Sequence, residues 1–206
     1  MTTTDEQWWA TLRALDEPVA PPSYPMPSSD VILGLLSGTP GALDSAKSFL
    51  DLVRQEQADR HARGEGDLTV PRGFDRAAAQ ARFDRLATLL GECFGEGCAV
   101  GSGSDACFGS VMVPAGLTRT RTKRSRVPVE LYVSVSSFGD LATYAPGSSE
   151  DPAPVHAEDR RRIDSALAEA GYVTVPRQVL DARYDGPNTW ALGEASTWYV
   201  RFFDLI

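Results

Sequence analysis

The sequence has little histidine, cysteine and lysine. Its 206 residues include two His, three Cys and two Lys, against eighteen Arg, a bias typical of a GC-rich bacterial genome. A Ser or Cys nucleophile needs a neighbouring base, which is most often His, and zinc sites use closely spaced His and Cys. His61 and His156 have no such neighbours in the sequence. We therefore expect no catalytic residue, no metal and no cofactor.

The cysteines are too few, and odd in number, for a disulfide framework. Cys93, Cys98 and Cys107 could supply three thiolates, but a structural zinc needs a fourth ligand. We predict free thiols, as in a reducing compartment. A Cys98–Cys107 crosslink is the alternative if the protein meets an oxidising one.

Long apolar runs are also missing. No stretch approaches the ~18 apolar residues of a membrane span, and residues 1–7 lack the basic and apolar regions of a signal peptide. These absences predict a cytoplasmic protein that does not contact a membrane.

The charge is acidic and unevenly divided. The net charge is −8, with sixteen acids and nine bases in residues 1–106 and twelve acids and eleven bases in residues 107–206. An acidic half argues against general nucleic-acid binding, because polyphosphate binding needs a positive field. It suits a basic protein partner, or it serves solubility alone.

The first half of the chain is predicted to be helical. Apolar residues recur at steps of three and four in residues 5–15, 39–61 and 75–93. Residues 17–27 hold five prolines, which predicts an extended strap over the surface. Ser29 is a plausible cap for a short helix that ends near residue 36.

The second half changes to a period of two after the glycine-rich segment 91–109. The clearest strand covers residues 127–135, where valines and Leu131 alternate with Glu130 and Tyr132. A helix is expected over residues 155–170, ended by Gly171. Further strands are expected at 108–113, 141–145, 172–175, 179–184 and 197–205, with a helix as the alternative for the last.

These patterns predict an α+β fold in which N-terminal helices pack on a C-terminal, mainly antiparallel sheet with one later helix. Residues 1–106 form an acidic helical lobe and residues 107–206 a sheet lobe, and the two are expected to make one compact domain.

Two segments invite functional hypotheses. Residues 101–106 resemble a glycine-rich phosphate loop, but a strand is expected after them where a dinucleotide fingerprint requires a helix. Residues 119–126 hold five cations in a predicted hairpin loop. That loop is a solvated turn or, as a less favoured alternative, a phosphate contact.

An enzyme remains an alternative reading. Glu130 and Tyr132 share the polar face of the predicted 127–135 strand, and Asp140 follows its turn. Carboxylates in one cleft perform acid–base chemistry when their environments separate their pKa values. The plain reading is a wet sheet face.

The end of the chain is rich in aromatic residues, with six of eighteen in residues 184–206. Segments 171–180, 184–188 and 197–204 resemble the ends of small uncharacterised actinobacterial proteins, some of which look like immunity proteins. The resemblance covers residues 171–206. It implies a stoichiometric inhibitor that buries the surface of a toxin and has no catalytic role.

The resemblance and the acidic charge favour a binding protein with a protein partner, for example a basic toxin. Aromatic residues and arginine dominate interface hot spots. The predicted partner-binding residues are Glu130 and Tyr132 on the sheet and, if exposed, Trp190, Trp198, Tyr199 and Arg201.

Overall fold

The computed structural model describes residues 3–20, 40–63, 67–103, 106–147, 154–193 and 195–204. The fold is α+β, as predicted: N-terminal helices precede a five-stranded mixed, mostly antiparallel sheet, and further helices follow it. Within these ranges, no helix combines the length and the apolar character of a membrane span.

The sheet has the strand order β1-β2-β3-β4-β5. The first four strands are antiparallel neighbours and β5 lies parallel to β4. The strands are β1 (Ala99–Ser102), β2 (Cys107–Val113), β3 (Leu131–Ser136), β4 (Leu141–Pro146) and β5 (Val173–Thr174). The strands predicted at 108–113, 141–145 and 172–175 are confirmed, whereas β1 lies in the glycine-rich segment where no strand was predicted.

The clearest predicted strand is correct from Leu131 onward and wrong at its start. Val129, Leu131, Val133 and Val135 are buried, but Val127 is 52% exposed. The Val127 carbonyl accepts from the Thr122 amide at 2.9 Å, so Val127 belongs to the turn that precedes β3.

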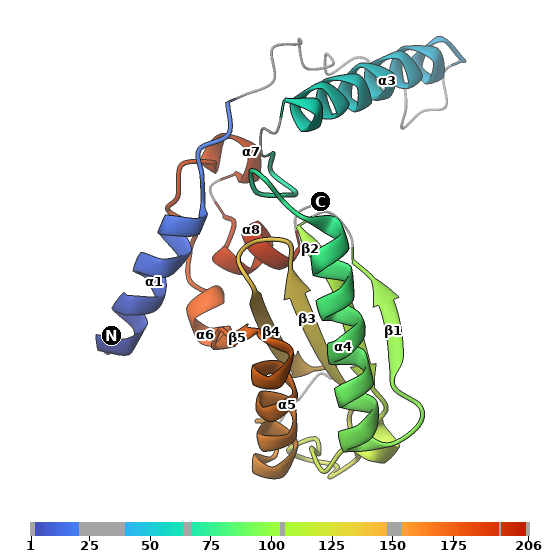
Figure 1. Cartoon of the computed structure of the whole chain (residues 1–206), viewed down its shortest axis with the longest axis vertical. Helices are drawn as coiled ribbons and strands as arrows, with labels where there is room; N and C mark the ends of the chain where they lie inside the picture. The colour runs from blue at the N-terminus through green and yellow to red at the C-terminus, as the bar shows by residue number, and fades with distance from the viewer. Residues whose placement is uncertain are drawn as a thin grey trace.

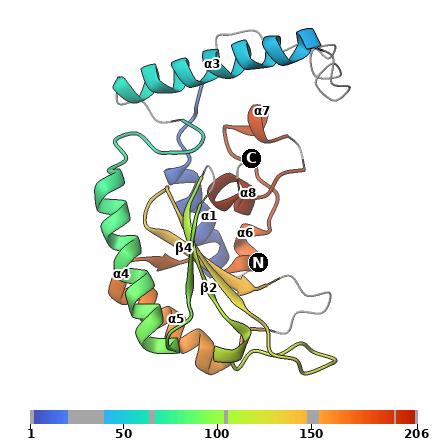
Figure 2. The ribbon, with the colours of Figure 1, turned by 90° about the vertical axis from the view of Figure 1, so that its right-hand side faces the viewer.

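Two long helices cover one face of the sheet (Figures 1 and 2). They are α4 (Arg76–Phe94) and α5 (Ala157–Ala170), and both match predicted helices. Gly171 ends α5 with φ +83°, the left-handed conformation that glycine adopts without steric cost. The core here combines Phe83, Leu86 and Leu90 of α4, Ile163 and Leu167 of α5, and the inward valines of β2 and β3.

A second core lies on the opposite face, around the end of β3. It is formed with α1 (Thr3–Leu15), α6 (Arg177–Leu180) and α8 (Trp198–Phe203), while α7 (Thr189–Leu192) lies beyond α8 (Figure 1). The Ser136 hydroxyl donates to the Phe202 carbonyl at 2.7 Å, which joins α8 to the sheet.

The predicted strands at 179–184 and 197–205 are wrong. The first segment contains the end of α6, and the second forms α8, the helical alternative. The Thr197 hydroxyl caps α8 by accepting from the Val200 amide at 3.3 Å. Trp198 and Phe202, four residues apart, stack with ring centroids 5.8 Å apart in the core. A strand would not bring these two side chains together.

The remaining N-terminal helix, α3 (Pro40–Ala62), confirms the helix predicted at 39–61 and extends away from the sheet (Figures 1 and 2). Of the proline-rich strap 17–27, residues 17–20 are described. The rest of the strap and the short helix expected at 29–36 lie outside the described residues.

Candidate functional site

The most unusual feature of the structure is a buried arginine. Arg201 lies on α8 and its side chain is completely buried. Its Nε donates to Asp16 Oδ1 at 2.7 Å, and the Asp16 side chain is also completely buried. Asp16 directly follows α1, so this ion pair ties the first helix of the chain to the last. Buried charges need such partners, because an unpaired charge in the interior is strongly disfavoured.

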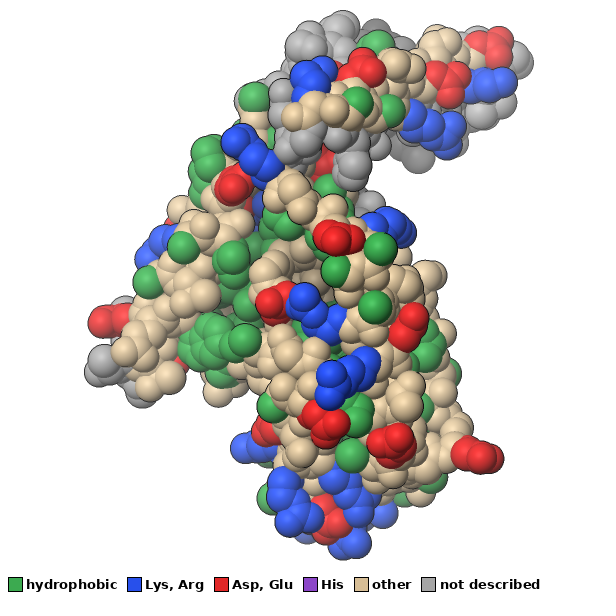
Figure 3. All heavy atoms as spheres, viewed as in Figure 1, with side chains coloured by type: hydrophobic (Ala, Val, Ile, Leu, Met, Phe, Trp, Pro, Cys, Tyr) green, Lys and Arg blue, Asp and Glu red, His purple; other side chains and the backbone are tan. Residues whose placement is uncertain are grey.

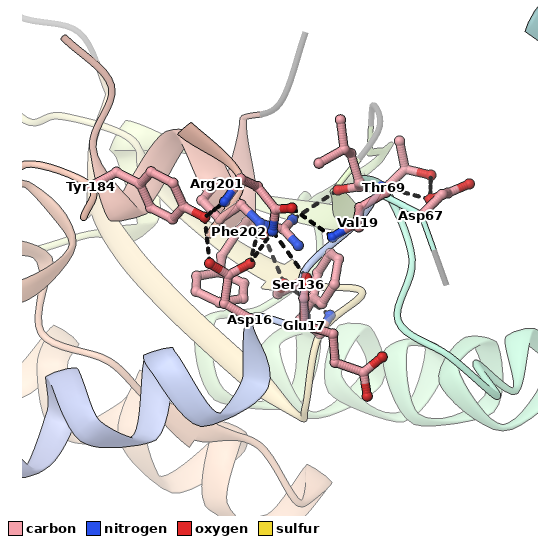
Figure 4. A network of polar contacts seen from close by, with 12 residues as sticks. Asp16, Glu17, Val19, Asp67, Thr69, Ser136, Tyr184, Arg201 and Phe202 are labelled. Atoms are coloured by element: carbon pink, nitrogen blue, oxygen red, sulfur yellow. Dashed lines mark hydrogen bonds and ion pairs between the residues drawn. The ribbon is translucent and has the colours of Figure 1, made fainter. Parts of the chain in front are cut away.

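Tyr184 and Asn188 also form hydrogen bonds with Asp16, and Figure 4 shows Tyr184 and Arg201 on either side of the Asp16 carboxylate. The Tyr184 hydroxyl donates to Asp16 Oδ2, and Asn188 Nδ2 donates to Asp16 Oδ1 at 2.8 Å. The Asn188 amide in turn donates to the Tyr184 oxygen at 2.9 Å. Burial, together with the hydrogen bond to Asp16, raises the pKa of Tyr184 above its ordinary value, so this tyrosine stays neutral and donates.

The turn from Tyr184 to Asn188 requires a glycine at position 186. A Cβ on Gly186 would lie 2.3 Å from Asp16 Oδ2 and 2.5 Å from the Tyr184 oxygen. Because glycine has no Cβ, the backbone of segment 184–188 can lie close to the ion pair.

A small cavity opens beside the guanidinium of Arg201. It encloses about 180 Å³, and its lining includes Glu17, Arg60, Asp67, Arg72, Phe138 and Arg201. Arg201 Nη1 donates to the Leu68 carbonyl at 2.8 Å, and the guanidinium carbon lies 4.3 Å from the centre of the Phe138 ring. Nη2 is buried and has no partner within the described part of the chain.

The predicted partner-binding residues near the chain end separate into two groups. Trp198 and Arg201 are 1% and 0% exposed, so the exposure on which their predicted role depended does not hold. Tyr199 is half-buried, with the Arg177 guanidinium 3.6 Å from its ring centre. Trp190 is 44% exposed, and its Nε1 donates to the Val19 carbonyl at 3.2 Å.

The predicted sheet-face residues also separate. Glu130 and Tyr132 lie together, with the Tyr132 hydroxyl 3.4 Å from Glu130 Oε1. Asp140 lies at the other end of β3 and pairs with Arg82 of α4. Six residues of strand separate Glu130 from Ser136, which corresponds to about 20 Å. The three residues of the enzyme alternative therefore do not converge on one cleft.

No protein-family model matches the chain, and no curated protein or solved structure is significantly similar to it. The geometry of the chain therefore carries the functional argument.

Metal-binding groups do not cluster in the described ranges, where no three His, Cys, Asp or Glu side chains lie close enough together to hold an ion. The three cysteines are free thiols, with Cys93 exposed and the other two half-buried. Burial raises the pKa of Cys107 to about 11.

The basic segment 119–126 projects from a fixed base at the lower end of the molecule, where Lys and Arg side chains gather (Figure 3). Asp159 of α5 is completely buried and accepts from the Arg119 amide and from the amide and hydroxyl of Thr120, at 2.7–2.8 Å for Oδ2. A phosphate contact through this segment stays a prediction.

The sequence reasoning missed Asp16 altogether and read Tyr184 and Asn188 as parts of a turn. Asn188 and Asp16 are 172 positions apart. No spacing rule links residues at that separation, and only the presence of an arginine in an apolar terminal segment hinted that a buried acid was needed.

Proposed function

We propose that this chain is a cytoplasmic, non-catalytic binding protein that covers the surface of a protein partner, as an immunity protein covers its toxin. One observation carries the proposal. Among the residues that the structure describes, helices α1, α6 and α8 cover the second face of the sheet around the end of β3, and no helix lies over its beginning (Figure 2).

The uncovered part presents one aromatic side chain among small and flexible ones. The strand register places Ala99, Met112, Tyr132 and Ala145 in one row across four strands. Tyr132 is 40% exposed and Met112 and Ala145 are half-buried. A broad surface with a central tyrosine suits contact with another protein better than enclosure of a small substrate.

Charge supports the same proposal. Glu130 lies beside Tyr132 and gives the surface a carboxylate. The chain carries a net charge of −8, most of it in residues 1–106, and this overall negative charge would favour association with a basic partner. Trp190 offers a second exposed aromatic side chain on α7, at the other end of the sheet, for a partner that extends that far.

The test is co-expression with each protein encoded by a neighbouring gene. A cognate toxin should arrest growth when expressed alone, and this chain should restore growth and form a 1:1 complex with it. The double variant Glu130→Lys/Tyr132→Ser should weaken binding at least about tenfold, since an interface tyrosine is often a hot spot.

The matched control is Val173→Ser, which changes a 50% exposed apolar residue on β5, an edge strand of the sheet. Equal loss in both variants would show that the face around Tyr132 is not the interface. If no neighbouring protein binds at micromolar concentration, the binding proposal itself is wrong.

A further inference from the structure

We infer that the cavity beside Arg201 binds a small oxyanion, such as a phosphate or the carboxylate of a small metabolite. This inference goes beyond the proposed protein-binding function and does not depend on it. It begins with the one guanidinium nitrogen of Arg201 that has no acceptor.

The other two nitrogens of Arg201 are already engaged. Nε donates to Asp16 at 2.7 Å and Nη1 donates to the Leu68 carbonyl at 2.8 Å. Nη2 is buried and has no partner among the described residues. A buried N–H group without an acceptor loses its hydration and gains nothing in return, and for a charged group that loss is largest. Arg201 belongs to the cavity lining, and a small shift of the cavity wall would let a ligand oxygen reach Nη2 and supply the missing acceptor.

The guanidinium is fixed before any ligand arrives. Asp16 is itself fixed by Tyr184 and Asn188, and the Phe138 ring lies 4.3 Å from the guanidinium carbon. A donor that is already oriented loses little conformational freedom on binding. Arginine is also the residue best suited to oxyanions, because its planar N–H groups match their geometry.

Two further arginines belong to the cavity wall. The Arg60 side chain is 15% exposed and pairs with Glu56 and the Ala20 carbonyl. Arg72 is 70% exposed, and its Nε lies 3.8 Å from Glu17 Oε2. A contact this long between two exposed groups is weak, so Arg72 can exchange Glu17 for a bound anion at small cost.

The acids around the cavity are already engaged by other groups. Three guanidinium groups line the cavity together with the carboxylates of Glu17 and Asp67, while Asp16 pairs with Arg201 and Glu56 with Arg60. Asp67 Oδ1 already accepts from the Thr69 amide and hydroxyl and from the Val70 amide, at 2.7–2.8 Å. The volume of about 180 Å³ is several times the ~30 Å³ that one water occupies in the liquid, so a small organic acid or phosphate fits.

The experiment titrates the full-length chain with inorganic phosphate and, separately, with acetate, by calorimetry at ionic strength held constant with chloride. We expect saturable binding of one anion per chain. Tighter binding of phosphate or of acetate identifies which group the natural ligand carries. Absence of saturable binding of either anion up to about 50 mM, a concentration that corresponds to very weak affinity, would overturn the inference.

Variants at the mouth of the cavity separate a specific site from general attraction to a cation. Arg60→Gln and Arg72→Gln should each weaken binding by about tenfold, the usual scale for loss of one charge-assisted hydrogen bond. The control is Arg54→Gln, on the same helix as Arg60 but with a side chain that is 75% exposed and not part of the cavity lining. An equal loss in Arg54→Gln would show that anions bind α3 nonspecifically.

These mouth variants avoid the buried ion pair, so they keep the test independent of folding. Circular dichroism of each variant should match that of the unaltered chain. If phosphate and acetate bind equally well to the unaltered chain and to the Arg60→Gln/Arg72→Gln double variant, the cavity is not the site.

Discussion

Asp16 Oδ1 and Arg201 Nε lie 2.7 Å apart, although 185 positions separate the two residues in the sequence. Both side chains are completely buried. The pair joins the end of α1 to α8, so the two ends of the chain close one core. This relationship makes the stability of the C-terminal segment depend on a single acid near the N-terminus.

Replacing Asp16 with Asn should destabilise the fold by about 3–5 kcal/mol, since removal of one member leaves the other charge buried and unpaired. Asp181→Asn is the control, because the Asp181–Arg177 pair is exposed and has the same 2.7 Å separation; it should cost less than about 1 kcal/mol. Urea unfolding followed by tryptophan fluorescence measures both. Similar losses in the two variants would mean that the buried pair contributes no more than a surface one.

Gly186→Ala should destabilise the chain by about 1–3 kcal/mol, the usual effect of forcing an extra methyl group into a packed site. The Cβ of the new alanine would collide with Asp16 Oδ2 and the Tyr184 oxygen, which are held in place by the hydrogen bond between them. Gly116→Ala should change stability by less than about 0.5 kcal/mol, because a Cβ there meets nothing within 4 Å. Thermal unfolding of the two variants compares them directly, and a neutral Gly186→Ala would show that the turn can move away.

Asp159→Asn should loosen the base of the basic segment 119–126. The carboxylate accepts from the amides of Arg119 and Thr120 and from the Thr120 hydroxyl, and an amide can replace only part of this acceptance. We expect trypsin to cut within residues 119–126 about tenfold faster, since local opening controls such cleavage.

Asp164→Asn on the same helix is the control for that experiment. Asp164 accepts a hydrogen bond from the Tyr144 hydroxyl at 3.0 Å and not from the backbone of the basic segment. Trypsin should cut the Asp164→Asn variant within residues 119–126 at the same rate as the unaltered chain. Faster cutting in both variants would trace the effect to α5 as a whole.

The cysteines should differ in reactivity. Burial raises the pKa of Cys107 to about 11, so little of this thiol is ionised at pH 8, and the thiolate is the reactive form. Cys93 is exposed. Iodoacetamide at pH 8 should therefore modify Cys93 first, as read by peptide mass spectrometry, and unfolding in urea should remove the difference. Modification of Cys107 at the rate of Cys93 would show that the β2 strand opens readily.

Stability should fall in alkaline solution. Burial raises the pKa of Tyr172 to about 12, and burial with the Asp16 hydrogen bond raises that of Tyr184. Because the folded pKa lies above the unfolded value of about 10, the stabilisation is complete below pH 10 and is lost as the pH rises toward the folded pKa.

The variant Tyr184→Phe isolates one of these tyrosines. It should be less stable than the unaltered chain at pH 8, because Asp16 loses a donor. It should also lose less further stability between pH 10 and pH 11, because no hydroxyl remains to titrate at that position. Urea unfolding at pH 8, 10 and 11 gives both values, and parallel curves for the two proteins would contradict the role of Tyr184.

Local patterns in the sequence predicted much of the fold. The stripe of Ile163, Ala166, Leu167 and Ala170 is buried as expected, and Gly171 ends that helix. The alternation through Leu131, Val133 and Val135 likewise marked the buried face of β3. In these elements the apolar period and the end signals agree, so few neighbours are needed to fix the structure.

The candidate site was far less predictable. Arg201 was expected to bind a partner if exposed, and the structure buries it against an acid that no sequence rule connects to it. The chain has 28 acidic residues, and one sequence gives no means of choosing Asp16 among them. Asp140 was grouped with Glu130 and Tyr132 because they are close in sequence, but the extended strand β3 between them places Asp140 far from Glu130.

The amino-acid sequence alone determined the helices and strands whose apolar period is long and unambiguous, because period and end signals act over a few residues. Tertiary structure decided the conformation of residues 198–203, where the spacing of aromatic residues fits a helix and a strand alike. There the choice fell to contacts with Asp16, Phe138 and the end of β3, since burying a guanidinium is possible only where a distant carboxylate meets it.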